Sequence, residues 1–591
     1  MLAPNIYSDV DGRYRGHDMR IHMDTAVKMY TVFSLWDTFR ALHPLFNLIE
    51  RNRTGDMVRS MLSMYQHDGH LPVWELAACE TWCMIGYHSV PVIVDAFKKG
   101  ITNFDERLAL EAMKATAESN LFGLNWYREK GYIPADKEGA SVSKTLEYAY
   151  DDWCIAEMAN MLGDEDTYRT YLQRAQHYKN LYDPETRFFR GKSNGCFVEP
   201  FDPNEVNFML TEANTWQYNF FVPQDINTHI RMMGGDSAYE AKLDQLFTSS
   251  AGLSGRHQSD ITGLIGEYAH GNEPSHHMAY LYNYIGKPSK TQELVHRIMN
   301  ELYTNQPDGL SGNEDCGQMS AWYVLSALGF YPVTPGSDKY VLGTPGVGVA
   351  TIRMENGHTF TVKASGLNAD KYFVREVFYN GEPWTKSYIT HDMILQGGEL
   401  IFVMDEKPGP AYGVAFRDRP VQQIVDHPII PVPFFKASSR TFEDQLTVEL
   451  ACIDPEASLV YNKGGGQTGF NPYEQPFHLS ENATLFAKAL RQGNESFTEQ
   501  ANFLKIPAGL SVDISNPYSP QYTAGGDKAL VNTIRGGDQF TTGNWQGYWG
   551  DDLVATIDLG KETKIKSIGA GFLQDERFSL PIILIPGLPP A

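Results

Sequence analysis

The chain has 591 residues, of which 42% are hydrophobic and 20% are charged, a composition typical of a globular protein with about two to four domains. Asp and Glu (72) outnumber Lys and Arg (49), and the resulting net charge of −23 argues against a nucleic-acid partner. No run of eighteen apolar residues occurs, and the six cysteines form neither a CxxC pair nor a Cys/His cluster, so we expect no membrane span and no zinc or redox motif.

Residues 1–332 are predicted to be mainly helical. Amphipathic segments such as LALEAMKATAE and KTQELVHRIMNELY alternate with segments that are apolar nearly all round, such as TLEYAYDDWCIAEMANML and GNEPSHHMAYLYNYI. Roughly ten to twelve such segments can be counted, which is enough for six helical hairpins. The sequence therefore predicts a mainly α fold, a six-hairpin (α/α)6 toroid whose inner helices point their ends at a central funnel.

Short strands are predicted after Pro332, where the hydrophobic period changes from helical to alternating. Residues 333–415, which include KYVLGT, VATIRM and LIFVMD, form a β region that completes the first domain. A proline-rich linker follows at 416–434, then β modules at 435–506 and 507–591. The loop NKGGGQTG lacks the features of a phosphate-binding loop and is predicted to be a plain turn. The apolar tail ERFSLPIILIPGLPPA is too short to span a bilayer and is expected to be a truncated end.

An inner helix is predicted over TLEYAYDDWCIAEMA, where Glu147 and Asp151 lie one turn apart with Asp152 beside them. Two carboxylates at this spacing cost a solvated helix ~0.2–0.5 kcal/mol. Either they lie on an ordinary wet surface or they face a polar cavity that needs them.

More carboxylates occur in the short connections between inner segments, beside Trp, Asn, Gly or His. These are Asp37, Glu75, Glu80, Glu212, Glu273, Glu314 and Asp315. Singly, each is explained by a helix cap or a surface acid. Jointly, a hollow lined by carboxylates and indoles suits glycoside hydrolysis, and the spare oxygen ligands suit Ca²⁺ or Mg²⁺. His276 and His277 are neighbours and point about 100° apart, so we expect one in the hollow, one packed and no shared zinc site.

Six segments together closely resemble glycoside hydrolase family 92. They are SLWDTFRALHPL (34–45), ETWCMIGYHSVPVIVDA (80–96), TLEYAYDDWCIAEMA (145–159), TEANTWQY (211–218), GNEPSHHMAYLYNY (271–284) and GNEDCGQMSAWYVLSALGFYPV (312–333). The resemblance covers about residues 18–410. It implies a calcium-dependent, inverting exo-α-mannosidase with a helical toroid, preceded in the family by a β-sandwich domain that contributes to the active site. We expect that this chain lacks the sandwich, and that the protein is exported to the periplasm or cell surface.

The resemblance also assigns roles to individual residues. Glu212 corresponds to the general acid, with a raised pKa, and Asp315 to the base, with a normal or lowered pKa; the two carboxyl groups should lie roughly 6.5–9.5 Å apart. Calcium ligands are assigned to Asn214, Glu273 and Asp315, with the ion bridging the mannose O2 and O3 hydroxyls. Substrate contacts are expected from Trp36, Asp37, Trp74, His88, Asp151, Asp152, Asn272, Glu273, His276 and Glu314. Asn272 replaces a histidine found in some relatives, which favours a linkage other than α-1,2.

Outside the helical part the resemblances are weaker. Residues 435–506 resemble the C-terminal β domain of chitobiase-type hydrolases, and residues 507–591 resemble the start of a discoidin-like carbohydrate-binding module that is cut short. The expected substrate is terminal α-linked mannose of N-glycans or mannan. Two alternatives stay open: another toroid enzyme of the trehalase, phosphorylase or lyase type, and a non-catalytic glycan-binding protein.

Overall fold

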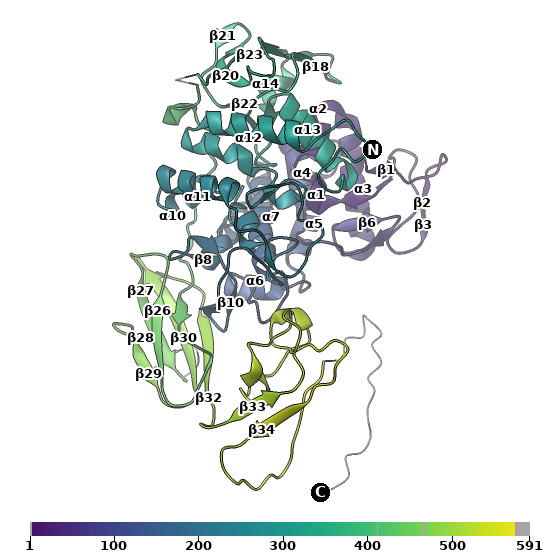
Figure 1. Cartoon of the computed structure of the whole chain (residues 1–591). Helices are drawn as coiled ribbons and strands as arrows, with labels where there is room; N and C mark the ends of the chain where they lie inside the picture. Colours follow the sequence, from purple (N-terminus) through teal and green to yellow (C-terminus); the bar gives the residue numbers. More distant parts are fainter. Residues whose placement is uncertain (1–2, 410–411, 465, 467, 574–591) are drawn as a thin grey trace.

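The computed structural model describes residues 3–409, 412–464, 466 and 468–573. Among these residues, all helices of seven or more residues lie between Leu42 and Ala327. All strands of four or more residues begin at Lys339 or later. Figure 1 shows this division, with the helices in the centre and separate β regions above and below them. No helix in the described part of the chain is long and apolar enough to cross a bilayer.

Inner and outer helices alternate along the helical part, as the sequence predicts. The inner elements are almost wholly buried: α2 (Leu42–Ile49), α4 (Ser89–Lys98), α7 (Ser141–Leu162), η3 (Met278–Ile285) and α13 (Gln318–Ala327). The outer helices are α3 (Arg51–Asp68), α5 (Glu106–Ala117), α8 (Glu165–Arg174), α11 (Asp236–Thr248) and α12 (Pro288–Glu301). The last inner helix, α13, packs against the first, α2, so the series returns to its start.

Three of the predicted inner helices take a different form. Trp74–Leu76 and Cys79–Glu80 pair as strands β6 and β7, and the helix of that segment, α4, begins only at Ser89. The turn between these strands places Ala77 and Ala78 at positive φ, a conformation usually marked by Asn or Gly, so the sequence carries no turn signal there. TEANTWQYNFFV forms only the short α9 (Thr215–Tyr218), and the helix predicted after Asn272 is 3₁₀ in form (η2, Glu273–Ser275, and η3).

The first β region packs on the helices. Strands β18 (Val349–Arg353), β19 (Thr359–Ser365), β23 (Gly398–Asp405), β20 (Phe373–Tyr379) and β21 (Glu382–Pro383) form a five-stranded sheet in that order. Their inward side chains belong to the same hydrophobic core as the helices, which extends from Tyr30 to Ile424. The helices and this sheet therefore share one hydrophobic core.

The second module has a core of its own, from Phe435 to Phe503. The boundary between the two cores lies within the predicted linker, 416–434. This linker is held along the helical part, because the backbone N–H of Ile424 donates to Asp225 and that of Val432 donates to Asn180, each at 2.9 Å. The composition predicts a linker at 416–434, and in the structure this segment is hydrogen-bonded to the helical part at Ile424 and Val432.

A shared sheet joins the second module to the helical part. Strand β24 (Phe434–Lys436) pairs in parallel with β11 (Cys196–Phe197), whose hairpin partner is β10 (Lys192–Ser193). Beside this pairing, the buried Glu499 of the module accepts a hydrogen bond of 2.6 Å from the Tyr132 hydroxyl and lies 3.7 Å from the buried Lys192 ammonium. A charged pair is thus buried where the two parts meet.

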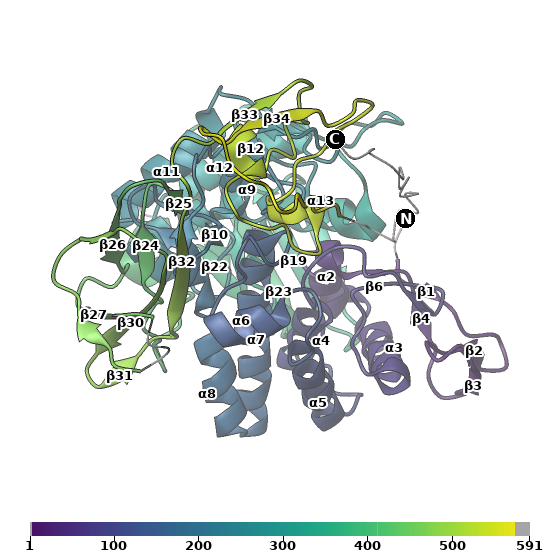
Figure 2. The same cartoon turned by 90° about the horizontal axis from the view of Figure 1, so that it is seen from below.

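The third β stretch contributes little to either core. Strands β33 (Ser511–Ile514) and β34 (Ala555–Asp558) pair with each other, and their side chains are mostly exposed. The stretch contacts the helical part through Phe208, which stacks on Tyr522 with ring centroids 5.4 Å apart. Figure 1 shows it below the helical part, and Figure 2, seen from below, shows it in front of the helices. The apolar tail, for which a truncated end is expected, lies outside the described residues.

We predict that Glu499→Gln loosens the junction between the second module and the helices. It removes the carboxylate from Lys192, whose ammonium nitrogen has no hydrogen-bond partner among the described residues. Leaving a buried charge unpaired costs about 3–5 kcal/mol, measurable as a fall in the free energy of unfolding on denaturant titration. Glu495→Gln, at an exposed position of the same module, should change it by less than about 0.5 kcal/mol.

The double variant Glu499→Leu with Lys192→Met separates this charge effect from packing. Because it removes both charged groups, it should recover most of the stability lost in Glu499→Gln. Equal stability of Glu499→Gln and the unchanged protein would contradict the proposed pairing.

Candidate active site

Three carboxyl groups from distant parts of the chain meet at one place. They belong to Asp37 in α1 (Leu35–Thr38), Glu273 in η2 and Asp315 in η4 (Asp315–Gly317), and one oxygen of each lies within 4.8 Å of the others. We call these three residues the carboxylate cluster. Like charges at this separation oppose one another, so the cluster requires protons or a cation.

The electrostatics of the carboxylate cluster reflect this conflict. Burial raises the pKa of Asp37 well above its usual value, and the charge of Asp315 raises it further. Burial has the same effect on the pKa of Glu273, reinforced by the charges of Asp37 and Asp315. Both carboxylate oxygens of Glu273 are buried without a hydrogen-bond partner among the described residues. A set of oxygen atoms with unfilled bonding capacity is the kind of ligand set that Ca²⁺ takes.

Glu212 lies beside the carboxylate cluster, just before α9. Its side chain is half-buried. Its backbone is in the left-handed region, with φ 48°, so the residue forms a turn before the helix begins. Asn272 donates from its side-chain nitrogen to the carbonyl oxygen of Glu212 at 2.8 Å. Burial, together with the charge of Asp260, raises the pKa of Glu212 to about 7. A carboxyl group with this pKa holds a proton near neutrality, as a general acid must.

Asp315 is also half-exposed, and a tight turn presents it to the cluster. Asp315 and Cys316 have φ 51° and 58°, while the Glu314 carboxylate caps the turn by accepting from the Gly317 N–H at 2.6 Å and the Ser320 hydroxyl at 2.7 Å. Burial raises the pKa of Asp315, a hydrogen bond from the Glu273 carboxyl group, when that group is protonated, lowers it, and the charges of Glu314 and Asp260 raise it, so that the net change is upward. The sequence interpretation expected a normal or lowered pKa, and the difference arises mainly because this carboxyl group is partly buried. Glu314 itself is used as a cap.

A buried ion network lies on helix α7. The His88 imidazole joins Asp151, at 2.7 Å from Nδ1, to Glu147, at 2.9 Å from Nε2. The other oxygen of Glu147 accepts from the Trp36 indole at 3.0 Å and from the Tyr218 hydroxyl at 2.8 Å. Burial lowers the pKa of His88, but the charges and hydrogen bonds of Asp151 and Glu147 outweigh it and raise the pKa to about 9. The imidazole is therefore a cation between two carboxylates.

Asp152 belongs to the same buried layer. It accepts from the Tyr87 hydroxyl at 2.7 Å and from Arg174 at 2.8 Å. The side chains of His88, Asp151 and Asp152 have no exposed surface. The sequence interpretation placed these three residues in contact with substrate. In the structure their side chains are fully buried and their hydrogen bonds are made with protein groups; Glu147, the other partner of His88, holds the Trp36 indole.

Asn214, which the sequence interpretation made a calcium ligand, has its side chain engaged in hydrogen bonds at the start of α9. It is the N-cap of α9 and forms a capping box with Gln217. Its side-chain nitrogen donates to Glu267 at 2.8 Å. Both ends of the amide are therefore engaged in holding α9, which follows Glu212. Asp37, expected to contact substrate, is one of the three members of the carboxylate cluster.

Three other predicted substrate contacts have different settings. His276 is fully buried, between the carbonyl oxygen of His270 and the side chain of Gln318, each at 3.0 Å, and burial lowers its pKa to about 3. It is a neutral packed residue and not part of an exposed hollow. Trp36 is 1% exposed, and Trp74 in β6 is half-exposed, so Trp74 is the better placed of the two indoles to meet a sugar ring.

Two residues at the site were missed by the sequence interpretation. Asp260 raises the pKa of Glu212, but it lies in a loop without a recognisable pattern. Arg40 is buried with its guanidinium 3.6 Å from Glu147 and 5.2 Å from the Trp36 ring. Its position one helical turn after Trp36 is a signal that could have been used, because a buried arginine requires a carboxylate partner.

Comparison with known proteins decides the family. Residues 1–406 match the model described as the glycosyl hydrolase family 92 catalytic domain. The chain belongs to glycosyl hydrolase family 92. The resemblance drawn from the six sequence segments is thereby confirmed.

Solved family 92 structures share this fold. One is an alpha-mannosidase of Bacteroides thetaiotaomicron in complex with mannoimidazole, 45% identical, with a TM-score of 0.69 over 71% of this chain and 57% of that chain. Another is an inverting mannosidase from the same organism, 36% identical, with a TM-score of 0.65 over 71% of this chain and 59% of that chain. A curated relative, an uncharacterized secreted glycosidase of Arthroderma benhamiae, is 29% identical over 62% of this chain and 50% of its own length. This family 92 chain thus spans about half the length of its relatives.

We predict that His88 makes stability depend on pH. A histidine in the unfolded chain titrates near 6.5 and His88 in the folded chain near 9, so its contribution is complete below about pH 6.5 and is lost as the pH rises through 9. A difference of this size corresponds to about 3 kcal/mol in the free energy of unfolding. Denaturant titrations at about pH 6 and pH 9.5 measure it.

The test depends on a difference between variants. His88→Gln should lack this part of the pH dependence. His43→Gln should keep it, because burial lowers the pKa of His43 to about 3 and that ring stays neutral throughout the range. If His88→Gln and the unchanged protein lost equal stability over the range, the ion network would not hold an imidazolium.

Proposed function

We propose that this chain carries the catalytic site of an exo-α-mannosidase that removes terminal α-linked mannose with inversion. One observation carries the proposal. In a chain of family 92, two half-exposed carboxyl groups occur at the carboxylate cluster: Asp315, which is part of it, and Glu212, which lies beside it. The 45% identity to an alpha-mannosidase solved with mannoimidazole supports the substrate class.

Each of the two carboxyl groups suits one role in hydrolysis. Glu212, with a pKa of about 7, can donate its proton to the glycosidic oxygen as the bond to the leaving group breaks. Asp315 can accept a proton from the water that attacks the anomeric carbon on the opposite face, which yields the β-anomer of mannose. In such inverting enzymes the two carboxyl groups lie roughly 6.5–9.5 Å apart, which is our prediction for this pair.

The carboxylate cluster fits the calcium ion that the family resemblance implies. Asp37, Glu273 and Asp315 would hold it, since they offer only oxygen atoms and Glu273 has no other partner among the described residues. Held there, Ca²⁺ would supply positive charge that stabilises the ionised form of Asp315 and would help to bind hydroxyl groups of the sugar. Asp315 presents one oxygen to the cluster, which leaves its second oxygen free to accept a proton from water.

The wider assignments form part of the same proposal. The contact between α13 and α2 supports closure of the helical hairpins into an (α/α)6 toroid. The secreted relative supports export to the periplasm or cell surface. N-glycans or mannan are the proposed substrates, since both present terminal α-linked mannose. Asn272, whose side chain holds the backbone of Glu212, is the position proposed to favour a linkage other than α-1,2.

We predict that Glu212→Gln and Asp315→Asn respond differently to the leaving group. Loss of an acid or base costs about 10²- to 10⁴-fold in rate. A p-nitrophenyl leaving group needs little protonation, so Glu212→Gln should lose much less activity on p-nitrophenyl α-mannoside than on an α-mannobiose. Asp315→Asn should lose a similar factor on both, because water attack is the same in each. Initial rates on the two substrates give the comparison.

Glu301→Gln, on the exposed face of α12, is the matched control and should keep full activity on both substrates. Proton NMR of the first product should show β-mannose. Full activity in Glu212→Gln on the mannobiose would refute its role as the acid. Binding of the mannobiose without release of mannose would favour a glycan-binding protein, and release of another product would favour a different toroid enzyme.

We predict that Ca²⁺ is required for hydrolysis and binds at the carboxylate cluster. Removal with EDTA should abolish mannose release, and added Ca²⁺ should restore it. Titration calorimetry should show that Glu273→Gln weakens Ca²⁺ binding by at least about tenfold. The calorimetric readout is independent of turnover, so it tests the cluster whether or not this chain is active alone.

Asp166→Asn, which removes an exposed carboxylate on α8, should leave Ca²⁺ affinity unchanged. Unchanged Ca²⁺ affinity in Glu273→Gln as well would place the ion elsewhere.

A further inference from the structure

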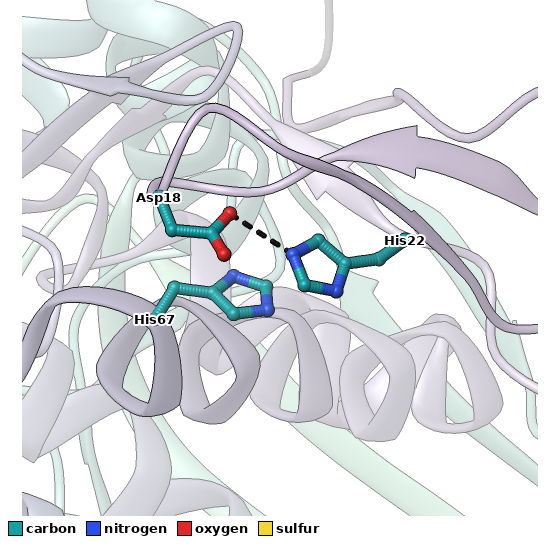
Figure 3. Close-up of side chains that lie close together, drawn as sticks. All are labelled: Asp18, His22 and His67. Atoms are coloured by element: carbon teal, nitrogen blue, oxygen red, sulfur yellow. Dashed lines mark hydrogen bonds and ion pairs between the residues drawn. The ribbon is translucent and has the colours of Figure 1, made fainter.

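A second group of ligating side chains lies far from the carboxylate cluster in the sequence. Asp18 and His22 belong to the hairpin formed by β2 (Arg13–Arg15) and β3 (Ile21–Met23), and His67 lies in the last turn of α3. Figure 3 shows the three side chains turned toward one another. One ligand atom from each lies within 4.8 Å of the others, and all three residues are half-exposed. We call these three residues the hairpin cluster.

The two imidazoles are already close. His22 Nε2 lies 2.9 Å from Asp18 Oδ1, and the rings of His22 and His67 stack with centroids 4.2 Å apart and planes inclined by 24°. Gly16 permits this approach, because a Cβ atom there would lie 2.6 Å from Nδ1 of His67 and 2.8 Å from the ring of His22. The chain therefore carries its smallest residue where the hairpin passes the two rings.

Part of the bonding capacity of these side chains is unused. The ring of His67 makes no hydrogen bond among the described residues, and the ring of His22 makes one, to Asp18. One nitrogen atom of each ring already lies within 4.8 Å of the other and of an Asp18 oxygen, so only a small adjustment would bring them to a common ion. Two imidazoles and one carboxylate form a ligand set typical of zinc, with a water molecule in the fourth position. This nitrogen-containing set differs in kind from the all-oxygen carboxylate cluster.

The electrostatic setting also suits a cation. Asp18 contributes a carboxylate whose oxygen lies 2.9 Å from Nε2 of His22, so an acidic oxygen and an imidazole nitrogen are already adjacent. Neither nitrogen of His67 is taken by a hydrogen bond among the described residues, so this ring can offer one to a metal ion. The adjacent His17 is paired with Asp68 at 2.8 Å, so its charge is balanced locally.

We propose that Asp18, His22 and His67 bind a divalent transition-metal ion, with Zn²⁺ as the best fit. The ion joins the hairpin to helix α3. A metal ion would stabilise the position of the hairpin, because hydrophobic packing does little to hold it: Met19, Ile21 and Met23 are more than 60% exposed. We assign the ion a structural role, since it would link the exposed hairpin to α3.

Zinc titration tests this site separately from the calcium site. The chain is first saturated with Ca²⁺, and ZnCl₂ is then added in a calorimeter. We expect one zinc ion per chain in the unchanged protein. Asp18→Ala, His22→Ala and His67→Ala should each weaken zinc binding by at least about tenfold. His478→Ala, which removes an exposed histidine in the second module, should bind zinc as the unchanged protein does. Co²⁺ in place of zinc should give a visible absorption band that is lost in His67→Ala.

Limited trypsin digestion provides a second readout. Arg13, Arg15 and Arg20 are exposed on the hairpin, so zinc should slow cleavage there in the unchanged protein and have no effect on cleavage in His67→Gln. Circular dichroism of the zinc-free variants confirms that they fold. The proposal is overturned if zinc binds equally well to the unchanged protein and to all three variants, if His478→Ala loses as much affinity as they do, or if the unchanged protein binds no zinc.

Discussion

Repulsion among buried carboxyl groups is the constraint on which the candidate site depends. Asp37, Glu273 and Asp315 come from three separate short elements, and the core that packs those elements holds the acids together against their mutual charge. Such an arrangement persists only if protons or a cation neutralise it. Because Glu273 has no hydrogen-bond partner among the described residues, a cation with several oxygen ligands resolves the conflict more completely than protons alone. Burial is the main cause of the raised pKa of Glu212 beside the cluster, and the negative charges of Asp260 and Asp315 add to it.

The ion network on α7 shows how the same fold treats buried acids that do not require an external cation. Asp151 and Glu147 share the His88 imidazolium, and Asp152 has the Arg174 guanidinium. Each of these acids is neutralised within the protein, so the network is complete in itself and serves to hold Trp36. The carboxylate cluster lacks an equivalent, since Arg40, which lowers the pKa of Asp37 and Glu273, also lies against Glu147. The contrast separates a structural group of acids from one suited to bind a ligand.

Local periodicity explains which parts of the fold could be predicted. The long outer helices and the strands of the first β region have repeating patterns, and they occur where the sequence indicates them. Elements that depend on single backbone angles were missed, such as the turn at Ala77 and Ala78. Site residues were recognised through family motifs, but burial decides their role, and a motif does not reveal burial. From its motif, Asp151 is therefore predicted to contact substrate, although in the structure it is fully buried and paired with His88. The hairpin cluster was invisible for another reason: His67 is 45 positions from His22, a spacing that matches no metal motif.

Backbone strain gives a reason for the irregular elements at the site. Glu212, Asp315 and Cys316 all have positive φ without being glycine, a conformation that costs about 1–2 kcal/mol per residue. A continuous helix would avoid this cost. Its successive side chains, however, would point in different directions around the helix axis and would not converge on the site. The left-handed turns before α9 and at the start of η4 instead bring carboxyl groups from different segments close enough for the charge of Asp315 to raise the pKa of Glu212. Glycine would relax the same turns and lose the carboxyl groups, so the strain at these positions is tied to the chemistry that the side chains can perform.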